Sequence, residues 1–412
     1  MSGRYLIRGG TVLTLGAKTS NHDEADVLVD EGRIVEVGRG LRARGSVVVD
    51  ATEAIVMPGF VDTHRHLARS LFKNLGSPGS AGSPRRFSIE SYGPDDLYTA
   101  TLIGLLGAIE AGITTVVDWS EAMTEEQFSA VTEAHRDSGL RTVLVDTRKT
   151  GSAGLPLDGS ITRARGFSAA DIDPAAASAA RASGLRIHVH AGGSPAPGRS
   201  LDGILGEDLT VIHGSGLEPG WMSAVSSARA SVALAPASEM ADGPGPPPVR
   251  ELMDAGIRPG LGVGDERVAP GDMFAQMRAF ISVQHATYFD LKLAGKGGLP
   301  NLLGTRQVIR SGTTDGAEAV GLGSVTGSLE VGKEADIVIL RTDRPNIFPI
   351  NDPIGAVVWG MDTSNVDWVF SRGVALMENG VLTADVADAR RRAESSWGRV
   401  GAALTTPAGG RP

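Results

Sequence analysis

Val-Met-Pro-Gly-Phe-Val-Asp-Thr-His-Arg-His, residues 56–66, is the stretch of this chain from which its fold and its chemistry are most directly predicted. An apolar, β-prone run, broken only at Pro58-Gly59, ends in two histidines two positions apart. Side chains at i and i+2 of a strand point to the same face, so His64 and His66 can reach one point in space. A metal ion needs that arrangement from two imidazoles. So short a motif could also be a pair of surface histidines after a strand. The choice between a metal site and surface histidines therefore depends on the rest of the chain.

Composition narrows the class of protein. The chain has 412 residues, which suits one large α/β barrel with a smaller partner domain. A formal net charge of -9 argues against a nucleic-acid partner, which would require a basic face. The absence of cysteine excludes disulfides, thiolate ligands and thiol nucleophiles. The sequence has no apolar run of about 18 residues and no apolar signal segment, so we expect a cytoplasmic protein without a membrane partner.

The two ends of the chain are rich in short β-prone runs separated by Gly, Asp-Glu-Gly and Pro turns. At the N-terminal end these runs are residues 5–7, 11–15, 26–29, 33–37 and 47–49; at the C-terminal end they are residues 336–340, 356–359, 366–371 and 374–377. Glu378-Asn379-Gly380 is a good hairpin turn. We therefore expect residues 1–57 and 321–385 to form a composite β-sandwich, and residues 386–412 to form a C-terminal helix and a disordered tail.

Between these ends, residues 58–320 alternate strand and helix patterns about eight times, which favours a (β/α)₈ TIM barrel over an open sheet. Helices are expected at 94–111, 124–138, 174–183 and 272–289. After the strand that ends at His66, barrel strands are expected at 113–117, 140–145, 160–167, 185–191, 209–213, 231–235 and 257–263. The run 160–167 carries the weakest pattern of the set. The overall class is α/β.

Five of the eight histidines follow or end predicted barrel strands. They are His64 and His66 on the first strand, His188 and His190 on the fifth, and His213 on the sixth. Active sites of this fold are built at the C-terminal ends of the strands, so the coincidence predicts a functional cluster. His22, His135 and His285 lie away from strand ends, and for them we expect structural roles.

An oxygen ligand is expected from the eighth strand, Gly-Leu-Gly-Val-Gly-Asp-Glu at residues 260–266. Asp265 is the candidate, and Glu266 points the other way if the strand continues. The alternative is that Asp265 caps the helix that follows. Nitrogen and oxygen donors without sulfur suit one divalent metal ion, most simply zinc, with iron, cobalt or manganese as alternatives.

These motifs together resemble the amidohydrolase superfamily. The resemblance rests on the His-Arg-His strand, the strand-5 and strand-6 histidines, the strand-8 aspartate and the late Gly-Ser-Leu-Glu-Val-Gly-Lys-Glu-Ala-Asp-Ile-Val at residues 327–338. It covers nearly the whole chain and is strongest for the cytosine-deaminase and chlorohydrolase-like branch. It implies a distorted barrel beside a composite β-sandwich, a metal-dependent hydrolase acting on C–N bonds, and the homodimer that is usual in the superfamily.

The resemblance also implies roles for single residues. His64, His66, His190 and Asp265 match the metal ligands. His213 matches the residue that contacts the attacking water. Asp265 is then the catalytic base that takes the proton of the water, while His213 stabilises developing charge. His188 shares a strand face with His190 and is expected to orient a ligand.

Three features depart from the family pattern. Deaminases of this branch carry a glutamate shortly after the strand-5 histidine, whereas His190 is followed by Ala-Gly-Gly-Ser-Pro. Glu239 or Glu121 could replace it, although each could equally be a pocket or surface residue. Without a gap, Gly264 falls where the family places its strand-8 aspartate, one residue before Asp265. Lys149 is out of place for the lysine that bridges two metals in relatives, which favours one metal.

The missing glutamate favours hydrolysis of an amide over deamination of a ring, because ring deamination needs an additional acid. Gly-, Ser- and Pro-rich segments at 76–84, 192–198 and 243–248 predict an open rim with few aromatic walls, suited to a peptide. The leading hypothesis is therefore amide hydrolysis on a modified peptide in natural product biosynthesis, as in amidohydrolases of bottromycin-type pathways. The alternatives are an aminohydrolase or chlorohydrolase of a small N-heterocycle, and a non-catalytic barrel that acts as a binding protein.

Overall fold

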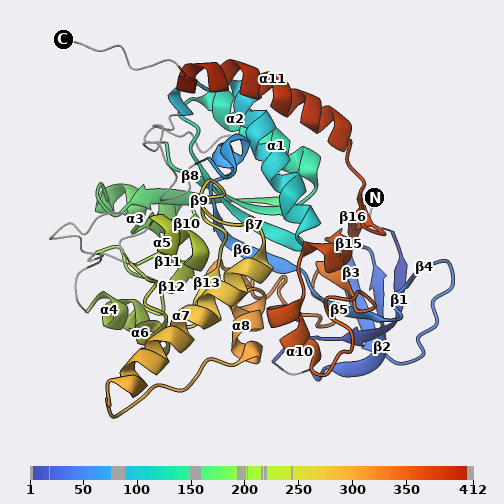
Figure 1. The fold of residues 1–412 in the computed structure, drawn as a ribbon. Helices are drawn as coiled ribbons and strands as arrows, with labels where there is room; N and C mark the ends of the chain where they lie inside the picture. Colours follow the sequence, from blue (N-terminus) through green and yellow to red (C-terminus); the bar gives the residue numbers. More distant parts are fainter. Residues whose placement is uncertain are drawn as a thin grey trace, which may run out of the picture.

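The structure is a computed structural model that describes residues 3–17, 19–75, 89–148, 159–192, 201, 203–214, 217, 220–242 and 245–405. The rim segment predicted at 76–84, most of the rim segment 192–198, Lys149 and the predicted disordered tail after residue 405 lie outside these residues. Two sheets organise the described part, one parallel barrel and one mixed sheet built from both ends of the chain (Figure 1).

Eight parallel strands form the barrel, in the order of the sequence. They are β6 (Phe60–Arg65), β7 (Ile113–Ser120), β8 (Arg141–Asp146), β9 (Ile161–Ser168), β10 (Arg186–His190), β11 (Leu209–Ile212), β12 (Ser231–Leu234) and β13 (Gly260–Leu261). The barrel closes between its first and last strands, where His66 N–H donates to Gly264 O at 3.0 Å and Gly264 N–H donates to His64 O at 2.8 Å. The predicted barrel is confirmed, including its weakest strand, and the short β13 makes it a distorted one.

Helices surround the strands. They are α1 (Pro94–Glu110), α2 (Glu125–Ser138), α3 (Pro174–Ala182), α4 (Trp221–Ser227), α5 (Pro236–Asp242), α6 (Val249–Asp254), α7 (Met273–Leu293), α8 (Thr305–Ser311) and α9 (Thr314–Ala319). The sequence sets their ends: Thr124 caps α2 by accepting from Gln127 N–H, and Gly139 ends it at a φ of 73°. Ala317 of α9 packs with Val61 and Val117 inside the barrel, at the end where the strands begin.

The mixed sheet joins the two ends of the chain. Its strands are β1 (Tyr5–Val12), β2 (His22–Asp30), β3 (Arg33–Gly38), β4 (Val47–Asp50), β5 (Ala54–Pro58), β14 (Ile337–Arg341), β15 (Val366–Ser371), β16 (Val374–Glu378) and β17 (Val381–Leu382). β5 pairs with β14 antiparallel and with β1 parallel. The chain then crosses from this sheet into the barrel at Gly59, where an added Cβ would lie 2.1 Å from Thr114 Cγ2. Only glycine fits this crossing, which explains why the apolar run is broken there.

Two strand predictions at the chain ends are corrected. Residues 356–359 are helical, because Asp352 caps α10 (Pro353–Gly355) and the chain continues into a π-helical turn, η3 (Ala356–Gly360). The runs 5–7 and 11–15 are largely one strand, β1, with an irregularity near Gly10. The hairpin turn is confirmed, with Asn379 and Gly380 at φ values of 49° and 77° before β17.

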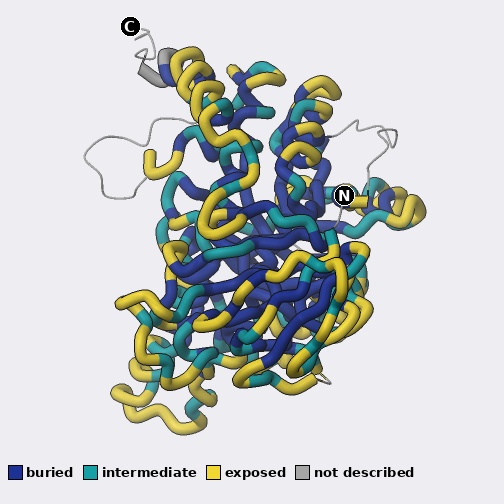
Figure 2. Tube along the Cα trace, turned by 90° about the vertical axis from the view of Figure 1, so that its right-hand side faces the viewer, coloured by how far each residue is buried: buried dark blue, intermediate teal, exposed yellow. Residues whose placement is uncertain are grey.

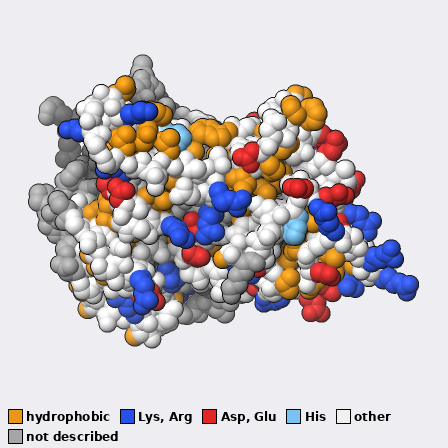
Figure 3. Space-filling model, turned by 90° about the horizontal axis from the view of Figure 1, so that it is seen from below, with side chains coloured by type: hydrophobic (Ala, Val, Ile, Leu, Met, Phe, Trp, Pro, Cys, Tyr) orange, Lys and Arg blue, Asp and Glu red, His pale blue; other side chains and the backbone are white. Residues whose placement is uncertain are grey.

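Most residues of the barrel strands are buried, several strands of the mixed sheet carry both buried and exposed residues, and the outer helices expose one face (Figure 2). The last helix, α11 (Val386–Thr405), lies across α1 at the top of Figure 1. On the face seen in Figure 3, basic and acidic side chains are intermixed. Among the described residues, no helix is both long and apolar enough to span a bilayer.

Candidate metal centre

Three of the predicted ligands meet inside the mouth of the barrel. One ligand atom from each of His64, His66 and His190 lies within 4.8 Å of the others. Their ring centroids are 4.7 Å (His64–His66), 5.2 Å (His64–His190) and 5.6 Å (His66–His190) apart. The cluster thus joins the ends of β6 and β10, as the strand period predicts.

The three imidazoles fit a divalent cation. Neither ring nitrogen of the buried His64 has a hydrogen-bond partner within the described part of the chain, an arrangement that costs free energy unless something else binds there. Burial, followed by the neighbouring His66, His213 and His190, holds the pKa of His64 well below its ordinary value. Burial lowers the pKa of His190 in the same way. The neutral imidazole that results is the form that binds metal.

His213 completes the cluster from the end of β11. Its ring centroid lies 4.7 Å from that of His190 and 5.1 Å from that of His64. Its Nδ1 lies 2.9 Å from Glu239 Oε1, on α5. The backbone of His213 has a φ of 72°, a conformation that a side chain other than glycine adopts only when its surroundings enforce it. His213 is therefore held in a special position beside the three ligands.

Asp265 does not join the histidines. Its carboxylate is paired with Arg69, whose Nη1 lies 2.6 Å from Asp265 Oδ2, and with Arg267. Burial alone would raise the pKa of Asp265, but the two guanidinium groups outweigh it and hold that pKa well below the ordinary range. The described contacts therefore differ from the expected roles of Asp265 as ligand and base.

Gly264 explains why no carboxylate projects from the preceding position. It closes the barrel against β6 and has a φ of 74°, which disfavours any side chain. An added Cβ would also lie 2.8 Å from Ala235 Cβ and 2.9 Å from Ser238 Cβ. An aspartate at residue 264 would therefore be strained, and the next residue turns towards the arginines.

Glu266 turns away from the cluster, as expected, and pairs with the arginine between the two ligand histidines. Arg65 is fully buried and lies between Glu266 Oε2, at 3.0 Å, and Asp62 Oδ2, at 3.3 Å. Lys73 and Ser70 also contact Glu266. This buried charge network ties β6 to the segment after β13, behind His64 and His66.

His188 lies in the barrel interior two residues before His190. Burial, with Arg186 adding to it, lowers its pKa to about 3. Neither of its ring nitrogens has a hydrogen-bond partner among the residues that the structure describes. No described hydrogen bond therefore supports the prediction that His188 orients a ligand. Its ring is buried in the barrel interior in the neutral form.

Trp119 is a site residue that the sequence reasoning missed. Its ring centroid lies 5.3 Å from that of His190 and 6.1 Å from that of His64. Val117 and Trp119 both face the barrel interior, so the period of two along β7 was the signal that could have identified it. Glu121 follows at the strand end, with Oε1 3.5 Å from His66 Nδ1 and its carboxylate paired with Arg69.

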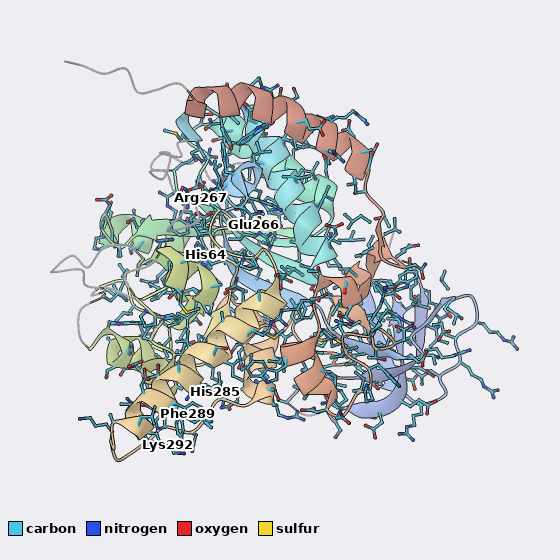
Figure 4. All side chains as sticks on the ribbon, viewed as in Figure 1. His64, Glu266, Arg267, His285, Phe289 and Lys292 are labelled. Atoms are coloured by element: carbon cyan, nitrogen blue, oxygen red, sulfur yellow. The ribbon has the colours of Figure 1, made fainter. Side chains whose placement is uncertain are left out.

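The remaining histidines lie outside the cluster. His135 on α2 contacts Asp118 and Thr142 through its two ring nitrogens, at 3.0 and 2.9 Å. The Nε2 of His285 lies 3.1 Å from Leu303 O, far along α7 from the region of His64 (Figure 4). His22 begins β2. These three were expected to be structural, and the described contacts of His135 and His285 are of that kind.

A distorted (β/α)₈ barrel with histidines at its strand ends, beside a sheet from both chain ends, defines a class of metal-dependent hydrolases. The chain belongs to the amidohydrolase family, whose model matches residues 55–376. It is a hydrolase acting on C–N bonds, of the deaminase and chlorohydrolase-like branch.

Similar proteins span nearly the whole chain. It is 29% identical to a 5-methylthioadenosine/S-adenosylhomocysteine deaminase of Pelotomaculum thermopropionicum, over 94% of this chain and 98% of the relative. It is 24% identical to a 5'-deoxyadenosine deaminase of Methanosarcina acetivorans, over 96% and 99%. An adenosine deaminase from Xanthomonas campestris with bound zinc has a similar fold, with a TM-score of 0.79 at 18% identity over 97% and 98% of the two chains. A mutant atrazine chlorohydrolase from Arthrobacter aurescens, complexed with zinc and atraton, gives 0.81 at 22% identity over 95% and 99%.

The position of Asp265 leads to a prediction. In Asp265→Asn we expect unchanged metal content and a loss of turnover smaller than the about 10²–10⁴-fold that removing a general base costs, because its carboxylate is bound by two arginines. Elemental analysis and steady-state kinetics of the purified variant measure both quantities. A variant without metal, or one with turnover reduced by a factor in that range, would contradict this expectation and support the roles of ligand and base that the resemblance implies for Asp265.

Proposed function

We propose that this chain deaminates a small aromatic N-heterocycle by hydrolysis, at a zinc ion held by His64, His66 and His190. The observation that carries the proposal is the indole ring of Trp119 beside this cluster, together with the His213–Glu239 pair. A flat aromatic wall suits a planar ring. The names of the relatives, which are adenosine-type deaminases, point to the same kind of substrate.

The chemistry divides between the cation and the residues around it. When bound, a divalent cation makes water a nucleophile at neutral pH and polarises the carbon that is attacked. His213 faces the cluster and is the candidate to accept the proton of the attacking water. Trp119 would orient the ring, and closely packed side chains around the buried histidines would exclude bulk water.

A deaminase acting on a small N-heterocycle, one of the alternatives drawn from the sequence, is thus favoured over the hydrolysis of a peptide. The case for a peptide substrate rested on a rim without aromatic walls and on the missing acid after His190. Trp119 supplies an aromatic wall, and Glu239 supplies a buried carboxylate next to His213. A specialised role in natural product biosynthesis has no support from the relatives.

Ammonia release tests the proposal. The protein, reconstituted with zinc, is incubated separately with adenosine, 5'-deoxyadenosine, cytosine, an amino-substituted triazine and a set of peptide amides. We expect ammonia from at least one amino-substituted ring, together with the corresponding oxo product by mass spectrometry. Cleavage of a peptide amide with no ammonia from any ring would overturn the proposal.

A further inference from the structure

The two oxygens of Glu239 are in unequal environments. Oε1 accepts from Ala235 N–H at 2.7 Å and contacts His213 Nδ1 at 2.9 Å. Oε2 is buried and has no hydrogen-bond partner among the residues described. The whole side chain is 3% exposed. A buried carboxylate oxygen without a donor is costly, so its position needs an explanation.

Oε1 favours one tautomer of His213. A carboxylate oxygen beside Nδ1 favours the tautomer that carries its proton on Nδ1, because that N–H can then donate to the carboxylate. In the neutral ring Nε2 is then an unprotonated acceptor, and the ring packs against His190 and His64. A carboxylate that selects one tautomer of a histidine in this way is a recurring arrangement in active sites.

Oε2 belongs to the carboxylate that contacts His213, so it lies close to the cluster. It can accept a hydrogen bond, but no described residue donates one. An exocyclic amino group brings N–H donors to this place, whereas a chloro or methoxy group in the same position brings none. A site built to bind a substrate N–H disfavours the analogue that lacks it, because the polar group of the protein is then left unpaired.

We propose that Glu239 is the residue that selects an amino-bearing ring, with Oε2 accepting an N–H of the leaving amino group while Oε1 holds the ring of His213 in place beside the cluster. This inference rests on the proposed function and adds a specificity determinant to it. The step balances: the water oxygen bonds to the ring carbon, and the exocyclic C–N bond breaks. One water proton ends on the departing ammonia, the other on the ring nitrogen.

The test compares adenosine with 6-chloropurine riboside, which give the same oxo product, in the zinc-loaded wild type, Glu239→Gln and a Glu334→Gln control. Glu334 pairs with Arg141, and neither residue belongs to the histidine cluster. We expect the wild type to prefer adenosine by at least about 100-fold in kcat/KM, and Glu239→Gln to reduce that preference at least about tenfold. A preference unchanged in Glu239→Gln would overturn the inference while leaving deamination intact.

Two further measurements, ligand binding and the tautomer of His213, do not depend on turnover. Quenching of tryptophan fluorescence gives the Kd of both ring compounds, and the same loss of preference is expected there even if neither is converted. Nitrogen NMR of His213 is expected to show a proton on Nδ1 in the wild type and a mixture of tautomers in Glu239→Ala. Equal Kd values for the two compounds in the wild type, or a His213 tautomer that does not respond to Glu239→Ala, would contradict the inference. Binding preference without any turnover would instead count against the proposed function alone.

Discussion

Replacing His190 by asparagine is expected to remove the metal and to lower turnover of any substrate by about 10³-fold or more. Two ligands on one strand hold a cation weakly, and the third comes from the other side of the barrel. The loss follows from the several kcal/mol of stabilisation that a bound cation contributes to developing charge. Elemental analysis and an ammonia assay, on the same preparation, measure the two effects together.

The matched control is His22→Asn, because His22 lies at the start of β2, outside the cluster. It is expected to keep both metal and turnover. The thermal unfolding of His190→Asn without metal should match that of metal-free wild type, since His190 makes no described hydrogen bond through its ring that its loss would break. Full metal content in His190→Asn would show that the cation lies elsewhere.

Replacing Glu266 by glutamine is expected to destabilise the fold by about 3 kcal/mol, the lower end of the cost of leaving a buried charge without its partner, since Asp62 still pairs with Arg65. The free energy of unfolding is measured by urea denaturation of the metal-free protein, so that loss of metal does not contribute. Glu394→Gln is the control, because Glu394 forms an exposed pair with Arg390 and should leave stability unchanged.

The Glu266 variant also tests whether the network positions the ligands. Arg65 lies between His64 and His66 in the sequence, so a shift of its side chain would disturb both. We expect weaker zinc binding in Glu266→Gln, by about 10–100-fold, as for other residues that support metal ligands. Unchanged zinc affinity in a destabilised variant would mean that the network stabilises the barrel seam without positioning the ligands.

Much of the fold follows from local patterns. Strand periodicity placed His64 with His66, and the alternation of strands and helices brought His190 and His213 to the same rim. The helical turn at 356–360 was missed because valine, present at residues 357 and 358, is enriched in strands. Asp352, which caps the preceding helix α10, lies outside that apolar run.

The details of the site depend on contacts between distant segments, which local patterns do not carry. Asp265 was expected to face the metal, but Arg69, 196 positions away, binds it. Glu239 contacts His213, 26 positions away, and the backbone of His213 has a φ of 72° that no motif predicts. The period of two along β7 could have identified Trp119. Its omission led us to expect a rim with few aromatic walls, which was one of the two grounds for the peptide hypothesis.

Metal binding of the full chain, titrated after removal of all metal by a chelator, tests the central claim most directly. One zinc ion per chain should bind, with release of ammonia from an amino-substituted ring restored in proportion to occupancy, and with both lost in His190→Asn. A chain that binds no metal above background after supplementation with zinc, iron, cobalt or manganese would contradict the claim that these histidines form the catalytic centre of a hydrolase.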